Sequence, residues 1–157
     1  MSMDLEEQYD KIYRYCYFKV HHKELAEDIT QEAFLRFLGS REYSESGKGL
    51  RYLYTIARNL CIDEYRKNET EPIDDETLEE KLFSQGHEEM VVNGLALKQA
   101  LAELYEEDRE LLLLRYVNDV PVSAICNLFG MSRFALYRRL NKLLKKLKDS
   151  LEGRQVR

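Results

Sequence analysis

A chain of 157 residues allows one or two small domains, each with a modest hydrophobic core. The composition is 34% charged and 44% hydrophobic with little glycine or proline, which favours a soluble protein made mainly of helices. The longest pure apolar run, residues 111–114, is far too short to span a bilayer. The acidic N-terminus lacks the apolar core of a signal peptide, and the three scattered cysteines do not suggest a disulfide framework. We therefore expect a cytoplasmic protein without membrane insertion.

The first two predicted helices follow from apolar spacing. Residues 5–20 carry apolar side chains at helical intervals: Leu5, Tyr9, Ile12, Tyr13, Cys16 and Val20. After a polar break, residues 24–38 predict a second helix, buried through Ala26, Ile29, Ala33 and Phe37. Its other side carries acidic and amide groups beside an outward leucine, namely Glu24, Asp28, Gln31, Glu32 and Leu35. This face suits docking of a basic partner helix, although an ordinary solvated face remains the alternative.

The residues of this half of the chain do not form a typical metal-binding pattern. Cys16 lies near His21 and His22, but no second pair of ligands follows to complete a zinc site. The carboxylates of the second helix lack the Glu-x-x-His pairs that di-iron bundles use. The sequence predicts no metal site and no cofactor.

A glycine- and serine-rich loop, residues 39–49, precedes a third predicted helix at about residues 50–68. Its predicted core is Leu53, Ile56, Ala57 and Leu60. Aromatic, polar and cationic side chains surround that core: Lys48, Arg51, Tyr52, Thr55, Arg58, Asn59, Tyr65, Arg66 and Lys67. Rings that stack on bases and cations that hold phosphates are what single-stranded nucleic acid needs. Half-buried packing tyrosines with solvated arginines are the competing interpretation.

Residues 69–89 contain nine acidic residues against Lys81, with one proline and one glycine. This composition is typical of a linker, which contains at most one short helix. Residues 95–117 then predict two more helices, the first with Leu97, Ala100, Leu101 and Leu104, the second with residues 111–114 and Val117. Asn118 and Asp119 lead into the turn that follows.

Residues 122–148 predict a short helix, a tight turn at Gly130 and a longer basic helix capped by Ser132. Five apolar residues are spaced to form a small core under the turn: Ile125, Leu128, Met131, Leu136 and Leu140. The opposite side carries Arg133, Tyr137, Arg138, Asn141 and Lys142. From Gly130 onward, nine Lys and Arg face two acidic residues in a chain of net charge −5. This is the layout of a helix-turn-helix, and its positive charge suits binding to DNA phosphates. A plain helical hairpin is the alternative.

Two parts of the chain resemble a known family. The second and third helices, with AEDITQEAFLRFL and LRYLYTIARNLCIDEYRK, resemble region 2 of bacterial sigma factors. The segment from LAELYEEDRELLLLRYV to the basic helix resembles their region 4, and the short acidic linker is similar to that of the extracytoplasmic-function group. The resemblance implies an all-α protein with region 2 at residues 1–68, an acidic linker at 69–93 and region 4 at 94–157.

The resemblance also implies roles for particular residues. Core RNA polymerase would bind Asp28, Gln31, Glu32 and Leu35 through the clamp helices of its largest subunit. The melted −10 strand would be captured, with one base flipped out, by Tyr43, Lys48, Arg51, Tyr52, Thr55, Arg58, Asn59 and Arg66. The −35 duplex would be read by Ser132, Arg133, Phe134, Tyr137, Arg138, Asn141 and Lys142. An anti-sigma factor is a further implied partner, and the linker would run through a basic channel of the polymerase.

Three departures from the family pattern stand out. Tyr52 replaces a usual tryptophan and Tyr105 a usual proline, which should leave the fold unchanged. Arg133, Phe134 and Tyr137 occupy recognition-helix positions where other residues are commoner, which suggests an unusual −35 sequence. A stand-alone helix-turn-helix regulator is the alternative function, but no seam for a dimer is visible. A helical adaptor would leave the basic helix unexplained, and the chain lacks the motifs of an enzyme.

Overall fold

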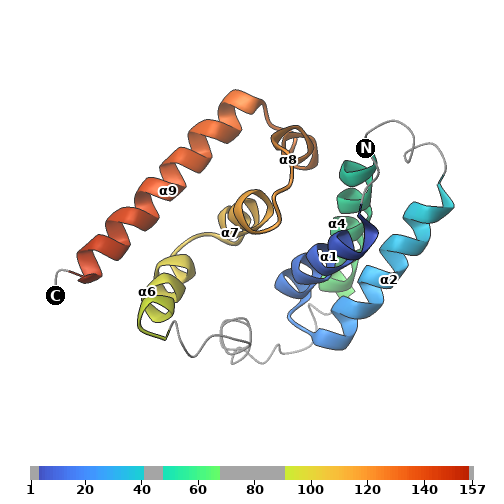
Figure 1. Cartoon of the computed structure of the whole chain (residues 1–157), viewed down its shortest axis with the longest axis horizontal. Coiled ribbons are helices and arrows are strands. Elements are labelled where there is room, and N and C mark those ends of the chain that lie inside the picture. Colours follow the sequence, from blue (N-terminus) through green and yellow to red (C-terminus); the bar gives the residue numbers. More distant parts are fainter. Residues whose placement is uncertain (1–3, 41–47, 68–90, 156–157) are drawn as a thin grey trace. The chain divides into compact units, whose positions relative to one another are not determined.

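The computed structural model describes residues 4–40, 48–67 and 91–155, and every regular element in these ranges is a helix (Figure 1). The chain divides into two compact units, Met1–Asp74 and Asp75–Arg157. The prediction of an all-α protein with two small helical domains is confirmed. The predicted acidic linker lies mostly outside the described residues. Within the described ranges, none of the helices combines the length and apolar character that crossing a membrane requires.

Three helices form the first unit: α1 (Leu5–Val20), α2 (Lys23–Gly39) and α4 (Gly49–Lys67). Each contacts the other two, as Figure 1 shows in blue to green. Helix α1 begins where the Asp4 carboxylate accepts a hydrogen bond from the Glu7 N–H at 3.2 Å. It ends at His21, whose left-handed backbone (φ 60°) turns the chain toward α2. Helix α2 in turn begins where His22 Nδ1 accepts from the Leu25 N–H at 3.1 Å.

Helix α1 buries a wider arc than its apolar spacing predicts. Ile12 and Cys16 are buried as expected, but Tyr15, Tyr17 and Phe18 are buried as well. Tyr9, Tyr13 and Val20 are half-buried, and Leu5 is 41% exposed in the first turn. The reason is that α1 packs against both α2 and α4, so a single stripe does not cover its contacts. The Tyr15 ring meets the Tyr54 ring of α4 edge to face, with centroids 5.7 Å apart.

The buried faces of α2 and α4 agree closely with the prediction. Ala26, Ile29, Ala33 and Phe37 are all buried, joined by Thr30 and Phe34. In α4, Leu53, Ile56 and Ala57 are buried, as are Tyr54 and Cys61, whereas Leu60 is half-buried. The buried Thr30 hydroxyl donates to the Ala26 carbonyl at 2.6 Å, so its burial leaves its donor satisfied.

The second unit contains α6 (Val91–Ala102), α7 (Glu106–Leu112), the π-helical turn η3 (Leu113–Val117), α8 (Val122–Phe129) and α9 (Arg133–Gln155). Helix α9 contacts α6, α7 and α8, so it is the helix against which the others of this unit pack. Leu104 is buried, but it lies beyond the end of α6 and not within the helix as predicted. Tightened turns, in which the Leu104 N–H donates to the Leu101 carbonyl at 3.1 Å, end α6 before Tyr105.

The predicted helix across residues 111–117 changes its winding halfway. The Asn118 N–H donates to the Leu113 carbonyl at 2.9 Å, five residues back, which inserts an extra residue into the turn. Leu114 stays buried, whereas Val117 is turned outward and is exposed. Asp119 then adopts a left-handed backbone (φ 53°) and leads into α8, in agreement with the predicted turn.

The predicted helix-turn-helix is confirmed, with its turn at Gly130 and its cap at Ser132. Gly130 has φ 64° and ends α8, and a Cβ added there would meet no described atom within 4 Å. Glycine is therefore favoured by its backbone angle and not by crowding. The Ser132 hydroxyl accepts from the Ala135 N–H at 3.1 Å and caps α9. The core under the turn consists of buried Ile125, Leu136, Leu140 and Leu143, with Leu128 and Met131 half-buried.

Candidate functional site

The outward face of α2 carries an acidic and apolar stripe. Asp28, Gln31, Glu32 and Leu35 are all exposed, with Leu35 at 68%. Leu38, which the sequence analysis did not select, is 59% exposed and lies three residues beyond Leu35. The opposite face of α2 is already packed in the core, so these two neighbouring leucines form an exposed apolar surface of the kind that often binds proteins. We call these five residues the α2 stripe.

One carboxylate of the α2 stripe is already paired. Glu32 Oε1 lies 2.8 Å from Nε of Arg36, one turn along the same helix. Both side chains are about half exposed, and ion pairs of this kind contribute at most about 0.5 kcal/mol. Because the pair is weak, Glu32 can exchange Arg36 for a cation of a binding partner at little cost.

The candidate single-strand surface lies along α4. Thr55 and Asn59 are exposed four residues apart, which places them on one face of the helix, and Lys48 is exposed directly before the helix begins. Arg66 is also exposed nearer the end of α4, and Arg51, Tyr52 and Arg58 are half-buried. Tyr43 lies outside the described residues. The described members of the set thus lie on α4 or directly before it, and Lys48, Thr55, Asn59 and Arg66 are the exposed ones.

Two residues of this surface also have contacts within the fold. The Tyr52 ring lies 6.3 Å from the Phe37 ring of α2, so part of it packs against the core as the competing interpretation held. The Thr55 hydroxyl donates to the Arg51 carbonyl at 2.8 Å, which leaves its oxygen free only to accept. Asn59 is exposed, and its side-chain amide can both donate and accept hydrogen bonds.

The N-terminal half of α9 presents the second candidate nucleic-acid surface. All seven residues of the set are exposed: Ser132, Arg133, Phe134, Tyr137, Arg138, Asn141 and Lys142. The buried Leu136, Leu140 and Leu143 hold the opposite side of the helix against the unit. The guanidinium of Arg138 lies over the Phe134 ring, 5.3 Å from its centroid. Cations, an amide and two aromatic rings thus lie at the end of the helix that a helix-turn-helix inserts into the major groove.

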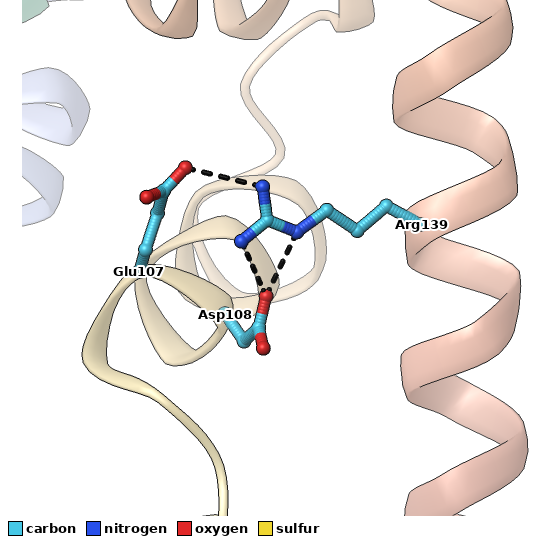
Figure 2. Close-up of polar contacts among 3 residues, drawn as sticks. All are labelled: Glu107, Asp108 and Arg139. Carbon is cyan, nitrogen blue, oxygen red and sulfur yellow. Dashed lines mark hydrogen bonds and ion pairs between the residues drawn. The ribbon is translucent and has the colours of Figure 1, made fainter.

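Arg139, the neighbour of Arg138, has a different position. Figure 2 shows its guanidinium reaching from α9 to the first turn of α7. Nε and Nη2 lie 2.8 Å and 2.7 Å from the same oxygen of Asp108, and Nη1 lies 3.1 Å from Oε1 of Glu107. Burial acts to lower the pKa of Arg139, but the hydrogen bonds and charges of Asp108 and Glu107 raise it overall. Arg139 therefore links two helices and is turned away from the exposed set.

The link between Arg139 and Asp108 has no signal in the sequence. The two residues are 31 positions apart, and neither lies in a motif that names the other. Among the described residues, histidine, cysteine and acidic side chains form no group of three or more that could hold a metal ion. Cys16, the cysteine considered above for zinc, is fully buried in the core of the first unit.

Two family models match the chain. Sigma-70 region 2 matches residues 5–71, which include α1, α2 and α4, and Sigma-70 region 4 matches residues 94–147, from α6 into α9. The ECF RNA polymerase sigma factor BldN of Streptomyces coelicolor is 32% identical over 92% of this chain. The ECF RNA polymerase sigma factor SigW of Bacillus subtilis is 29% identical over 89% of it. The chain spans 60% of the length of BldN and 84% of that of SigW.

A solved structure has the same fold. The sigma factor RpoE of Bartonella quintana, in complex with the anti-sigma factor NepR, superposes with a TM-score of 0.62 at 15% identity. The match covers 95% of this chain and 97% of that one. The two region models, in the order α1 to α4 and then α6 to α9, together with the ECF relatives, identify the protein: it belongs to the extracytoplasmic-function group of the sigma-70 family.

Proposed function

We propose that this protein binds core RNA polymerase, directs it to specific promoters and helps to melt the −10 element. The observation that carries the proposal is the match of both sigma regions in one chain, each with an exposed and chemically suitable face. The protein itself would catalyse no reaction. Its contribution is binding energy, which the polymerase uses to open DNA.

The α2 stripe is the proposed polymerase-binding surface. Its exposed leucines, Leu35 and Leu38, offer apolar area to a partner, and Asp28 and Glu32 offer negative charge beside it. This combination suits an amphipathic basic helix, as the clamp helices of the largest polymerase subunit would provide. Because Glu32 is held only by an exposed ion pair with Arg36, docking costs little in lost internal contacts.

The α4 surface is the proposed binding site for the melted −10 strand. Lys48, Arg66 and the half-buried arginines would neutralise phosphates, and the exposed part of the Tyr52 ring offers a stacking platform. Asn59 would hydrogen-bond the edge of a base that has left the stack. Extrusion of a base costs a few kcal/mol, and stacking with hydrogen bonding in a pocket can offset that cost.

The α9 surface is the proposed reader of the −35 duplex. The Ser132 cap fixes the start of the helix, and Arg138 with Tyr137 lies one turn in, where side chains reach base edges. Lys142 lies further along and would contact phosphate. The protein would thus hold duplex DNA with one unit and single-stranded DNA with the other.

Regulation and location follow from the same proposal. The similar RpoE structure contains an anti-sigma factor, and we propose that an anti-sigma protein also binds this chain when it is inactive. The active protein would act in the cytoplasm, at the nucleoid with polymerase and promoter DNA. The acidic segment 69–89 would pass through a basic nucleic-acid channel of the polymerase, where its charge replaces that of RNA.

Reconstituted transcription tests the proposal. Core polymerase from the host should be retained by the tagged protein, and the complex should give a run-off transcript from cognate promoters that core polymerase alone does not give. Binding to promoter DNA without core polymerase, at an affinity that core does not change, would contradict the proposal and favour a stand-alone regulator. A failure to retain core polymerase at all would contradict it as well.

A further inference from the structure

Phe134 is an unusual residue to find on a solvated helix end. It is the second residue of α9 and its side chain is 75% exposed. The Ser132 cap holds this end of the helix, so the ring has a defined place at the tip of the recognition helix. Side chains of a helix lean toward its N-terminus, which points the ring toward whatever the helix end meets.

Arg138 completes a pair with this ring. It lies four residues along the helix, and its guanidinium carbon lies 5.3 Å from the centroid of the Phe134 ring. A cation over a ring face is attracted by the electron density of the ring, and the contact restricts the rotamers of the arginine. Arg138 is thereby pre-organised, so less conformational entropy is lost when its planar fork meets a ligand.

The major groove offers one partner for each member of the pair. An arginine fork matches O6 and N7 of guanine in a bidentate contact, the commonest specific contact between protein and DNA. An exposed phenyl ring has no polar group to offer, and the apolar group that the major groove presents is the C5 methyl of thymine. The two groups lie 5.3 Å apart, and base pairs lie about 3.4 Å apart along the duplex, so the two groups are close enough to each other to contact neighbouring base pairs.

We infer that Phe134 and Arg138 act as one reading unit that selects a guanine adjacent to a thymine in the −35 duplex. The inference rests on the proposed role of α9 and deepens it by naming the bases. Phe134 has two tasks in this pair of side chains: its ring contacts the thymine methyl, and it positions Arg138 for guanine. Phe134 is thus a specificity-determining residue of this chain.

The test uses the full-length protein with core polymerase and a promoter library randomised in the −35 element. Wild type should enrich a thymine next to a guanine. The selected thymine is then replaced by deoxyuridine, which removes only the methyl group. Loss of one buried methyl corresponds to about fourfold weaker binding, and loss of the guanine contact to about 5- to 150-fold.

Four variants separate the two tasks of Phe134. Phe134→Ala should bind thymine and deoxyuridine promoters equally and should discriminate less well against replacement of the guanine. Phe134→Leu should still respond to the methyl group but should lose part of the guanine preference, because leucine has no ring face for Arg138. Arg138→Ala should lose the guanine preference. Leu144→Ala, which shortens another exposed apolar side chain of α9, should behave as wild type.

The outcomes distinguish this inference from the proposed function. Enrichment of −35 bases without a thymine beside a guanine would overturn the reading unit but leave promoter recognition by α9 intact. An equal effect of deoxyuridine on wild type and Phe134→Ala would also overturn it. A library with no enrichment at any −35 position would overturn the proposed role of α9 itself.

Discussion

Arg139 of α9 and Asp108 of α7 are joined by two contacts to a single carboxylate oxygen, at 2.8 Å from Nε and 2.7 Å from Nη2 (Figure 2). The Asp108 side chain is 12% exposed and that of Arg139 is 35% exposed. The next residue along the same helix, Arg138, faces solvent with its guanidinium over an exposed ring. Two adjacent arginines of one helix therefore have different surroundings: Arg139 holds α9 to α7, whereas Arg138 lies on the exposed face of α9.

The first prediction follows from this division. Arg139→Ala should lower the free energy of unfolding of the second unit by about 1–3 kcal/mol, because it leaves a largely buried carboxylate without its cation. Arg139→Lys should recover part of the loss, since lysine keeps the charge but cannot make the forked contact. Urea unfolding of the full chain, followed by circular dichroism, measures both changes.

Arg138→Ala is the matched control for this prediction. It removes the same side chain one position away, from an exposed site, and should change the free energy of unfolding by less than about 0.5 kcal/mol. Equal destabilisation by the two alanine variants would mean that the contact with Asp108 is not what distinguishes them.

Local signals made most of the helix-turn-helix predictable from sequence. The left-handed backbone at Gly130 and the cap at Ser132 depend on residues within a few positions of each other, and both were predicted. The buried faces of α2 and α4 followed from apolar spacing for the same reason. Features of this kind depend only on residues that are close together in the sequence.

Features that depend on distant partners were not predictable. The burial of Tyr15, Tyr17 and Phe18 arises because α1 contacts two helices at once, which the spacing within α1 does not reveal. The exposure of Val117 depends on the π-helical turn, a change of backbone winding with no side-chain signature. Leu38 could have been found, since it continues the spacing of Leu35 on the exposed side of α2.

The α2 stripe gives a prediction about polymerase binding. The double variant Asp28→Lys, Glu32→Lys should weaken binding to core polymerase about tenfold or more, since like charges placed against each other at an interface cost several kcal/mol. Helicity and thermal stability should change little, because both residues are exposed. Co-precipitation with core polymerase at matched concentrations measures the effect.

A charge reversal on another helix of the same unit is the control for the effect of net charge alone. Glu6→Lys, Asp10→Lys changes the net charge equally, at two exposed positions of α1 one turn apart. This variant should bind core polymerase as wild type does. Equal loss in the two double variants would mean that overall charge, and not the α2 stripe, governs docking.

Asn59 gives a prediction about melting. Asn59→Ala should leave core binding unchanged and should reduce open-complex formation about fivefold, the equivalent of one lost hydrogen bond of about 1 kcal/mol. A promoter with a pre-melted −10 element should partly rescue the Asn59→Ala variant, because the free-energy cost of separating the DNA strands has been removed. Permanganate footprinting of open complexes on both templates provides the measurement.

Asp63→Ala is the control on the same helix. Asp63 is exposed one turn beyond Asn59, and shortening it should not reduce open-complex formation. If Asn59→Ala were equally defective on duplex and pre-melted promoters, its role in holding an extruded base would be contradicted.

Two tyrosines of α1 give the last prediction, on alkaline stability. Burial raises the pKa of Tyr13 and of Tyr17 above the ordinary value of 10.0, and for Tyr13 the neighbouring Tyr17, Glu27 and Tyr9 raise it further. The folded state therefore keeps these protons at a pH where the unfolded chain releases them. The stabilisation is fully present below about pH 10 and is lost as the pH rises above it.

The double variant Tyr13→Phe, Tyr17→Phe keeps both rings, which stack with centroids 6.3 Å apart, and removes both ionisable groups. Its free energy of unfolding should fall less steeply than that of wild type between about pH 9 and about pH 11, as measured by urea unfolding at each pH. Tyr65→Phe, which removes the hydroxyl of an exposed tyrosine of α4, should follow wild type. Parallel pH profiles for wild type and the double variant would mean that burial of these two phenols does not set the alkaline limit of the fold.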